Sequence, residues 1–534
     1  MNVAAALLLL LVVGCGAGGI ALFAMATSTK TQIQGAPTAG PSDAPKAKRA
    51  SKVADQIIKD VIAGGWQVGQ ILGSEAELLA RYQVSRAVFR EAVRLVEHQQ
   101  VARTRRGPGG GLVVTEPTVD AVIDAVVLYL YRAEARLDEV FEARLVLEDI
   151  AAGLAPTRLE EQDLATLRAF ADDAQPLAPA DPRALHSLVA AMSRNPAVEL
   201  FVDVLTRVAM LYSSGWHDVG PAAHAETTHA HARIAQAVMS GDASTAQHRM
   251  RRHLEAEADY LRKRRSARQL LPGSAIALSQ SANGKRAETV ARCITQQVVD
   301  DGLQPGQLVG TEPELIAREG VSRAVFREAV RLLEHHQIAR MRRGPGGGLF
   351  VFEPSAAAVS EVAAIYLARR GMRLSDLAEV RTGVEIAIAG LAAARIDADG
   401  AVAIKDALDR EANTPADERP DVVHDLHAAV AAAAGNRVLE LIALVLIRLS
   451  LIYQIERLAS GASEQISAEA LRAHEGIAAA VEAGDRELAL HRMRRHLEAR
   501  SSLVDCAIDH APAPRPAAPS GSGLGHVPAG VGGD

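Results

Sequence analysis

Apolar and charged side chains alternate with a helical period in a stretch that begins at Val84. The apolar positions are Phe89, Ala92, Val93 and Val96, and the arginines that recur every four residues are Arg86, Arg90 and Arg94. Because residues four apart share one face of a helix, the pattern predicts an amphipathic helix with its apolar face buried and its arginine face in solvent. Ser85 is a preferred N-cap residue and predicts where this helix begins.

The neighbouring patterns predict another helix before this one and a β-hairpin after it. Ser74 and Glu77 have the spacing of a capping box, which opens a helix that ends around residues 81–83. The segment ARTRRGPGGGLVV, from Ala102 to Val114, predicts a strand, a glycine-rich turn and a second strand. A helix, a tight turn, an arginine-bearing helix and a hairpin are typical of a winged helix-turn-helix, whose second helix enters the major groove of DNA.

The same pattern occurs again 237 residues later, with Thr311 and Glu314 as the second capping box. The stretches 84–114 and 321–351 are identical at 26 of 31 positions. The five differing pairs are Val96 and Leu333, Gln99 and His336, Val101 and Ile338, Thr104 and Met341, and Val113 and Phe350. Later segments also align, with the offset growing to 241 and then 243. This repetition predicts a duplicated two-domain chain.

Composition and repetition together predict the fold class and the domain boundaries. Aromatic residues make up only 3% of the chain, and Ala, Leu, Val and Arg are abundant, which favours packed helices over sheets. We expect a mainly α protein with two winged helix-turn-helix domains, each followed by an all-helical bundle. The expected boundaries are 51–116 and 288–353 for the winged helices, 117–264 and 354–510 for the bundles, 1–25 for an apolar leader, 26–50 for a disordered lead-in, 265–287 for a linker and 511–534 for a disordered tail.

The charge distribution favours DNA binding by the two predicted winged helices. The net charge of −6 excludes a uniformly cationic chain, but the windows 85–106 and 322–343 each contain six arginines and two glutamates, a local charge of +4. A merely solvated helix face would leave the capping boxes and hairpins unexplained, and GPGGG lacks the GK[ST] ending of a phosphate-binding loop. The expected DNA-binding residues are Ser85, Arg86, Arg90, Arg94, Arg103, Arg105, Arg106 and Gly109, together with Ser322, Arg323, Arg327, Arg331, Arg340, Arg342, Arg343 and Gly346.

Three histidines recur at matching positions in the two predicted bundles. They are His186, His231 and His253 in the first, and His427, His474 and His496 in the second; the last two of each set are 22 residues apart. Three imidazoles with one open position form a common divalent-metal site. Arg144 with Glu148 also recurs, as Arg381 with Glu385. We interpret each of these pairs as a packing salt bridge, with effector binding by the arginine as the alternative.

The motifs quoted above resemble a known family. The pattern G-S-E-x-E-L-x-A-R-x-x-V-S-R-x-x-x-R-E-A-x-R-x-x-E, followed by GGGLVV, resembles the winged-helix domain of the GntR superfamily, and the larger domain resembles the all-helical FCD domain of its FadR subfamily. The resemblance covers residues 51–264 and 288–509. It implies base contacts from the start of each recognition helix, at Ser85, Arg86, Arg90, Ser322, Arg323 and Arg327. A further DNA-contacting arginine of the family is replaced here by Ala76 and Pro313.

The same resemblance implies a metal held by three histidines and one aspartate, with a carboxylate effector bound to the metal. The aspartate normally lies four residues before the first histidine, where this chain has Pro182 in one copy and Val423 in the other. Asp181 and His424 are the expected substitutes. The implied cofactor is a divalent metal, zinc or similar, in one or both bundles. Without it, the same cavity would take an acyl-CoA or an organic acid directly.

These features predict a ligand-responsive, sequence-specific transcription regulator, and a repressor rather than an activator. Its partners would be a double-stranded DNA operator and a small carboxylate or acyl-CoA effector. Two matched readers in one chain predict an intramolecular pseudo-dimer on a palindromic operator, with further homo-oligomerisation left open. The alternative is a metal- or organic-acid-binding sensor that does not read DNA. The sequence shows no nucleophile–base arrangement, so we do not expect an enzyme.

The cysteines and the first residues of the chain bear on its compartment. Cys15, Cys293 and Cys506 have no disulfide or CxxC spacing, which favours a reducing compartment. Residues 3–24 are apolar and long enough to span a bilayer, but no cation precedes them, as export would require. We expect a cytoplasmic, nucleoid-associated chain, either because translation starts at Met25 or because residues 1–25 anchor it with the body inside.

Overall fold

The structure, a computed structural model, consists of two halves with the same order of elements. It describes residues 44–105, 107, 109–171, 184–212, 221–264, 286–335, 338–342, 344, 346–352, 355–415, 418–419, 422–453 and 464–509. The first half comprises α1 (Ala44–Ala63), β1 (Ile71–Gly73), α2 (Glu75–Tyr82), α3 (Arg86–His98), β2 (Ala102–Arg105), β3 (Gly111–Val114), α4 (Val119–Arg132), α5 (Leu137–Arg158), α6 (Glu161–Ala171), α7 (Ala184–Met192), α8 (Pro196–Tyr212), α9 (Pro221–Met239) and α10 (Ala243–Arg264). The second half comprises α11 (Arg286–Asp300), β4 (Leu308–Gly310), α12 (Glu312–Glu319), α13 (Arg323–His335), β5 (Ala339–Arg342), β6 (Gly348–Val351), α14 (Ala356–Arg369), α15 (Leu374–Arg395), α16 (Ala398–Asn413), α17 (Asp425–Ala433), α18 (Arg437–Tyr453), α20 (Glu464–Glu482) and α21 (Arg486–Asp509).

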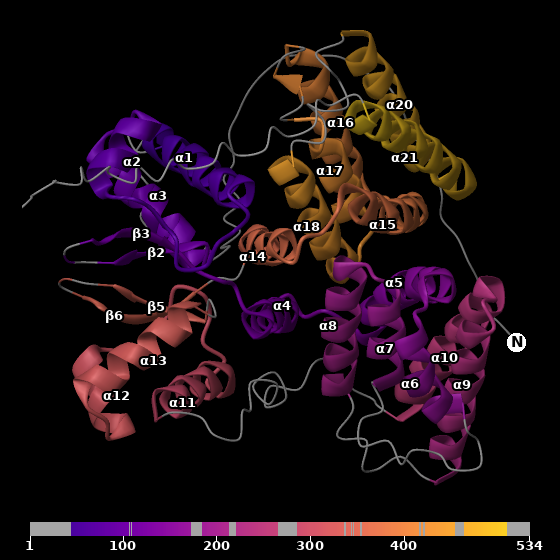
Figure 1. Cartoon of the computed structure of the whole chain (residues 1–534), viewed down its shortest axis with the longest axis horizontal. Coiled ribbons are helices and arrows are strands. Elements are labelled where there is room, and N and C mark those ends of the chain that lie inside the picture. The colour runs from indigo at the N-terminus through magenta and orange to yellow at the C-terminus, as the bar shows by residue number, and fades with distance from the viewer. Residues whose placement is uncertain are drawn as a thin grey trace, which may run out of the picture.

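Figure 1 shows the two winged helices at one end of the molecule and the two helical bundles at the other. Each winged helix has a three-stranded sheet, and all remaining described elements are helices. The predicted fold class, mainly α with two winged helix-turn-helix units that each precede a helical bundle, is confirmed.

Capping interactions begin the helices of each winged unit. Ser74 N donates to Glu77 Oε2 at 2.8 Å, and Glu77 N donates back to Ser74 Oγ at 3.3 Å, which is the reciprocal pattern of a capping box at α2. Ser85 Oγ accepts a hydrogen bond from Val88 N at 3.4 Å and caps α3. Thr311 repeats the capping box at α12. The predicted starts of these helices are therefore confirmed.

Each hairpin pairs with a short strand that lies before the first helix of the helix-turn-helix. The strand orders are β1-β3-β2 and β4-β6-β5, and all pairs are antiparallel. Arg103 pairs with Val113 and Arg340 pairs with Phe350, so the two wings have the same register. The predicted hairpins are confirmed. The sequence did not indicate β1 and β4, because three residues show too little alternation to be recognised as a strand.

The lead-in predicted at 26–50 is wrong at its C-terminal end. α1 begins at Ala44, and its residues Ala50, Ala54 and Ile57 are buried. The alanines of this segment continue the helical apolar spacing upstream, whereas the prediction counted them with the Pro, Gly and Lys residues as a composition typical of disorder. α11 likewise begins at Arg286, inside the predicted linker. The leader at 1–25 and the tail at 511–534 lie outside the described residues.

The long helices α5 and α15 form the centres of the two bundles. α5 packs against α7, α8 and α10, and α15 packs against α17, α18 and α21. Both helices are buried along most of their length, and their buried residues include charged ones. Among the residues that the structure describes, none of the helices is long and apolar enough to cross a bilayer.

Two asparagines link the halves through equivalent contacts. Asn195 Nδ2, from the first bundle, donates to Glu379 Oε2 of the second bundle at 3.2 Å. Asn436 Nδ2, from the second bundle, donates to Glu142 Oε2 of the first at 2.9 Å. Asn436 is the counterpart of Asn195, and Glu379 is the counterpart of Glu142. Each half therefore offers the same surface to the other.

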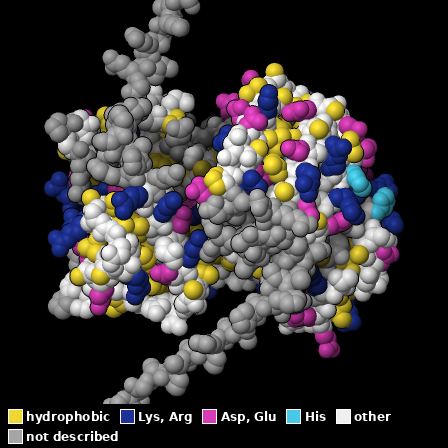
Figure 2. Space-filling view, turned by 90° about the horizontal axis from the view of Figure 1, so that it is seen from above, with side chains coloured by type: hydrophobic (Ala, Val, Ile, Leu, Met, Phe, Trp, Pro, Cys, Tyr) yellow, Lys and Arg dark blue, Asp and Glu magenta, His cyan; other side chains and the backbone are white. Residues whose placement is uncertain are grey.

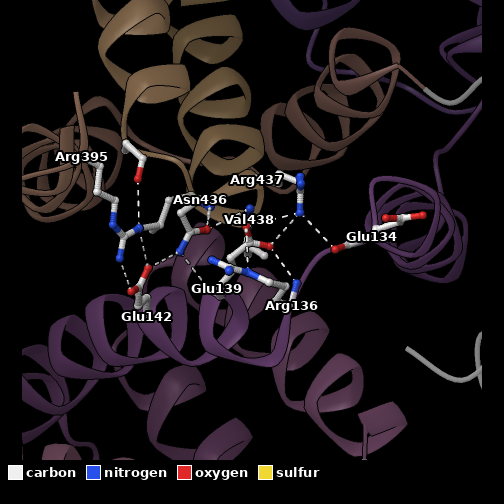
Figure 3. Close-up of polar contacts among 10 residues, drawn as sticks. Glu134, Arg136, Glu139, Glu142, Arg395, Asn436, Arg437 and Val438 are labelled. Carbon is white, nitrogen blue, oxygen red and sulfur yellow. Dashed lines mark hydrogen bonds and ion pairs between the residues drawn. The ribbon is translucent and has the colours of Figure 1, made fainter. Parts of the chain in front are cut away.

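Two arginines form a second pair of equivalent contacts between the halves. Arg158 forms an ion pair with Glu379, and Arg395 forms one with Glu142, with Arg395 Nη1 at 3.1 Å from Glu142 Oε2. Figure 3 shows Arg395 and Asn436 meeting Glu142 from the opposite half. It also shows Arg437, which binds the backbone oxygen of Glu134 at 3.0 Å. This last contact has no counterpart, because proline occupies the position that matches Arg437 in the first half.

The two winged helices are attached to the bundles differently. Arg448 of α18 forms ion pairs with Asp55 of α1 and Glu361 of α14, and the core of the first winged helix is continuous with that of the bundles. Within the described residues, the core of the second winged helix forms a cluster of its own. The positions that match Arg448 and Asp55 are Arg207 and Arg292, which have the same charge and cannot form this ion pair.

Candidate DNA interface and histidine centres

The predicted recognition helices α3 and α13 present their arginines to solvent. The side chains of Arg90 and Arg94 are 68% and 75% exposed, and those of Arg323 and Arg327 are 68% and 64% exposed. The predicted contacts Ser85, Arg86, Ser322 and Arg331 are exposed as well. Figure 2 shows Lys and Arg side chains gathered at the left edge, the end at which Figure 1 places the winged helices. This edge offers a cationic surface to a polyanion.

In each copy, an acidic residue of the preceding helix lies beside one or two arginines of the recognition helix. Arg323 Nε lies 2.8 Å from Glu312 Oε1, and Arg327 Nε lies 3.6 Å from the same oxygen. Arg90 Nε lies 3.5 Å from Glu75 Oε1 in the first copy. The hydrogen bond from Arg323 lowers the pKa of Glu312, so this carboxylate is ionised at neutral pH. Sequence reasoning missed both glutamates, because an acidic residue in the first turn is an ordinary feature of helices.

The wings carry the remaining predicted arginines. Arg105 Nη2 donates to Gly109 O at 2.7 Å, and the guanidinium of Arg342 lies 4.3 Å from the centre of the Phe350 ring. Gly109 and Gly346 have φ angles of +68° and +73°, which the tight turn of each wing requires and which glycine adopts without strain. Arg103 and Arg340 are exposed, whereas Arg106 and Arg343 lie outside the described residues.

In the first bundle, the three predicted histidines converge from three helices. His253 Nε2 of α10 lies 3.1 Å from His231 Nε2 of α9 and 3.2 Å from His186 Nε2 of α7. All three side chains are buried. His186 Nδ1 contacts the carboxylate of Glu148, and Arg144 Nε donates to the other oxygen of that carboxylate at 2.7 Å. The ion pair of Arg144 and Glu148 therefore contacts Nδ1 of His186, the ring nitrogen that does not face the other two histidines.

The second bundle repeats the arrangement. The three histidines, from α17, α20 and α21, have ligand atoms that all lie within 4.8 Å of one another, and His474 Nε2 is 3.3 Å from His496 Nε2. His427 Nδ1 lies 2.6 Å from Glu385 Oε2, and His474 Nδ1 lies 2.7 Å from Glu411 Oε2. Two carboxylates, Glu385 and Glu411, therefore contact Nδ1 atoms of this histidine centre.

The geometry of both centres fits a divalent metal. At His186, His427 and His474, a carboxylate beside Nδ1 keeps the proton on that nitrogen, so Nε2 is left as an unprotonated ligand. Zn–N distances of roughly 2.0–2.1 Å in a tetrahedral site place the ligand nitrogens about 3.3 Å apart. The Nε2 separations of 3.1–3.3 Å agree with that spacing. Without a cation, the convergent lone pairs would repel one another.

The protonation states also suit a metal site. Burial is the main cause that lowers the pKa of His231, His253, His427 and His496, and neighbouring histidines contribute; the pKa of His253 falls to about 3. The neutral imidazole that results is the form that binds metal. Burial opposes the charge of Glu148, but its arginine and histidine partners outweigh burial and hold its pKa at about 2.

Comparison with known protein families assigns both kinds of domain. The family described as "Bacterial regulatory proteins, gntR family" matches residues 49–112. The family described as "FCD domain" matches residues 139–256 and 376–499. The chain carries a GntR-family winged helix and two FCD domains.

Individual relatives are more distant. The putative HTH-type transcriptional regulator RmpR of Mycobacterium gastri is 27% identical over 161 residues, which is 28% of this chain and 57% of RmpR. The chain therefore matches little more than half the length of this curated relative. Among solved structures, Streptococcus agalactiae GntR is 22% identical, with a TM-score of 0.31 over 40% of this chain and 99% of that chain. E. coli McbR/YncC is 17% identical, with a TM-score of 0.22 over 42% of this chain and 100% of that chain.

The FCD domains depart from the expected ligand set at the fourth position. In the second FCD domain, Val423 is buried and offers no ligand atom. His424 is buried beside it, and its ring centre lies 6.0 Å from that of His427, but it is not one of the three residues with ligand atoms within 4.8 Å. His424 as an extra ligand stays a prediction. Asp181, its proposed equivalent in the first FCD domain, lies outside the described residues.

The two predicted effector-binding arginines lie behind the histidine centres. Arg144 and Arg381 are buried, and each donates to the glutamate one turn further along its helix at 2.7 Å. Arg144 also donates to Glu257 at 3.0 Å. Sequence reasoning identified these pairs as salt bridges but missed their contact with the first histidine of each FCD domain. The recurrence of the pair in both halves was the available signal, whereas Glu257 had no recurring counterpart to reveal it.

Proposed function

We propose that this chain is a ligand-responsive, sequence-specific transcription regulator of the GntR type and FadR subfamily, which acts in the cytoplasm as a repressor and has no catalytic role. A tandem duplication would explain why its elements and motifs occur twice. One polypeptide would then act as a pseudo-dimer that reads both halves of a palindromic operator. The GntR-family and FCD matches support the general class, and the contacts between the halves support the pseudo-dimer.

The reciprocal contact between the bundles carries this proposal. In a two-fold symmetric dimer, each partner uses the same surface, so every contact occurs twice with its roles exchanged. Asn195 and Arg158 meet Glu379 as their counterparts Asn436 and Arg395 meet Glu142. The two halves of one chain therefore associate as two subunits would. One chain therefore carries two recognition helices with exposed arginines, as a dimer of ordinary subunits would.

The histidine centres supply the ligand response in this proposal. His186, His231 and His253 would hold one divalent metal, and His427, His474 and His496 would hold another. A bound metal would supply an open coordination position for the carboxylate of an effector. Glu148 and Glu385 orient the first histidine of each set, and their arginine partners keep these carboxylates in place. An acyl-CoA is the alternative effector.

The decisive experiment has two steps. Genome-wide mapping of the DNA bound by the tagged chain identifies the operator, which we expect to be an inverted repeat. Light scattering on a defined operator fragment then gives the mass of the complex, and we expect one chain per operator. Two chains per operator would overturn the pseudo-dimer. A chain that contains metal but shows no sequence preference would instead support the alternative function, a metal- or organic-acid-binding sensor without DNA recognition.

A further inference from the structure

A cavity of about 550 Å³ lies between the two FCD domains. Its lining comes from α5 and α10 of the first domain and from α15 and α21 of the second, which meet at the boundary between the halves in Figure 1. A volume of this size is typical of small-molecule sites, which measure roughly 300–1,000 Å³. None of the six clustered histidines lines it. The cavity is therefore distinct from both histidine centres.

The two halves differ in charge beside this cavity. The sequence HRMRRHLEA occurs at 248–256 and again at 491–499, followed by Glu257 in the first copy and by Arg500 in the second. In the first FCD domain, Glu257 pairs with Arg144 at 3.0 Å, so that arginine meets two carboxylates. In the second, Arg381 keeps only the equivalent of the first carboxylate, and Arg500 brings a positive charge to the place of the second.

Both arginines of the second FCD domain line the cavity. Burial, together with the nearby charge of Arg381, lowers the pKa of Arg500 to about 10. Arg500 is therefore still protonated at neutral pH. Two cations that face one partly enclosed space repel each other, and an anion between them would relieve this repulsion.

Most of the remaining lining residues are apolar or hydroxylic. The exceptions are Gln247 and Glu379, and the Glu379 carboxylate already pairs with Arg158 and Asn195. Leu377 and Leu497 come from the second FCD domain, and Ile150 and Leu154 come from the first. Thr382, the residue that follows Arg381, adds a hydroxyl group. An aliphatic group would be buried against side chains of both domains at once, which is favourable in proportion to the apolar area removed from water.

We propose that this cavity binds an organic anion with an aliphatic portion, its anionic group between Arg381 and Arg500 and its aliphatic portion against leucines of both FCD domains. One molecule binds per chain, because the equivalent position in the first copy is Glu257. The ligand touches both halves, so it stabilises one arrangement of the two FCD domains. Its regulatory meaning rests on the function proposed above, whereas the binding itself does not.

Calorimetric titration of the full-length chain with decanoate tests the proposal without DNA. We expect one decanoate per chain, with binding retained in the presence of EDTA because the cavity contains no histidine ligand. Decan-1-ol, which has the same aliphatic chain and no charge, should bind at least about tenfold more weakly. Two decanoates per chain, or loss of binding in EDTA, would place the ligand at the histidine centres and overturn the proposal. Absence of binding would overturn it as well.

Three variants locate the site. Arg500→Glu installs the residue of the first copy and should weaken decanoate binding at least about tenfold, with Arg500→Gln weakened in the same direction. Leu154→Trp fills the cavity from the first FCD domain and should weaken binding to a similar extent. Arg494→Glu makes the same charge change at an exposed position of α21 and should leave binding unchanged.

Circular dichroism melting of each variant separates loss of binding from loss of folding. Binding that survives Arg500→Glu in a folded chain would refute the anion site, and binding that survives Leu154→Trp would refute its position between the domains. A chain that binds decanoate but no operator would refute the proposed regulator function alone. A chain that binds an operator but no decanoate would refute this cavity site alone.

Discussion

Arg86 and Arg323 are the first residues of α3 and α13, directly after the capping serines, and this position is the one at which a recognition helix reaches base edges. Replacing either with alanine should weaken binding to the operator by ~1–3 kcal/mol for each base that the arginine reads. Binding to scrambled DNA of the same length should change much less. Fluorescence anisotropy on the two DNA fragments measures both effects.

The matched control for this prediction is Arg168→Ala, which removes an exposed arginine of α6, far from the winged helices. It should alter neither affinity. If the double variant of Arg86 and Arg323 kept the full preference for the operator, these arginines would not be the residues that read bases.

Variants of His253 and His496 test whether a divalent ion binds at each histidine centre. Each donates one of three convergent nitrogens, so His253→Ala and His496→Ala should each remove one of two bound divalent ions per chain. Elemental analysis by mass spectrometry measures the metal content of the purified protein. His248→Ala, an exposed histidine on the same helix as His253, is the control and should retain both ions. Unchanged metal content in both ligand variants would show that the ions bind elsewhere.

For single residues, the sequence identified the clustered histidines but not the carboxylates that orient them. The separation of 22 residues in both copies marked His231 and His253 as a pair, because the same spacing occurred twice. Glu411, which contacts His474, could not be predicted, because that contact depends on how α16 packs against α20. The change from Glu257 to Arg500 is visible in the sequence, but only the cavity beside it gives the change a chemical meaning.

Two glycines of the second half, one in the wing and one in a helix, give predictions of opposite sign for the stability of their domains when each is replaced by alanine. A Cβ at Gly348 of β6 would lie 2.8 Å from the backbone oxygen of Gly310, so Gly348→Ala should destabilise the second winged helix by ~1–3 kcal/mol. A Cβ at Gly476 of α20 would meet only the Arg492 side chain, at 3.7 Å or more, so Gly476→Ala should stabilise its domain by ~0.5–1 kcal/mol. Denaturant unfolding of each variant measures the two changes.

Each variant serves as the control for the other, since both add one methyl group. Equal effects of the same sign would mean that the close approach of β4 to β6 does not limit the side chain at Gly348. A large effect in the second winged helix with no change in the bundles would agree with its separate core.

Caps and periodicity predicted the recognition helices well, because a serine cap, an arginine face and an apolar face all agree from Ser85 onward. The start of α1 was missed because alanine carries little hydrophobic contrast, so residues 44–50 resembled the polar segment before them. Local agreement among signals therefore decided which elements the sequence alone could define.

For the whole molecule, the reciprocal contacts predict cooperation between the two readers. Replacing both Asn195 and Asn436 with alanine removes two hydrogen bonds to the opposite half from each side, together with the side-chain caps of α8 and α18, and loosens the fixed distance between the winged helices. Affinity for an operator with two half-sites should fall about tenfold, ~1.4 kcal/mol. Affinity for DNA with a single half-site should not change, and an equal loss on both fragments would contradict the pseudo-dimer. The two DNA fragments are compared by gel-shift titration.

The ion pairs of Arg448 predict a difference between the winged helices. Arg448→Ala should free the first winged helix from the second FCD domain, so hydrogen exchange in α1 should become about tenfold faster or more, ~1.4 kcal/mol. Exchange in α11 should not change, because Arg292 occupies the position of Asp55 in that half. Hydrogen-exchange mass spectrometry reports both helices in one experiment, and equal acceleration of the two would refute the difference.

The unequal attachment of the winged helices has a consequence for the direction in which the chain lies on DNA. A homodimer looks the same from either end of a palindrome, but a chain with one anchored and one separate winged helix does not. On an operator with identical half-sites, the chain would bind equally in two opposite orientations. On an operator with unequal half-sites, one orientation would dominate, and the protein would present a defined side to whatever binds the neighbouring DNA.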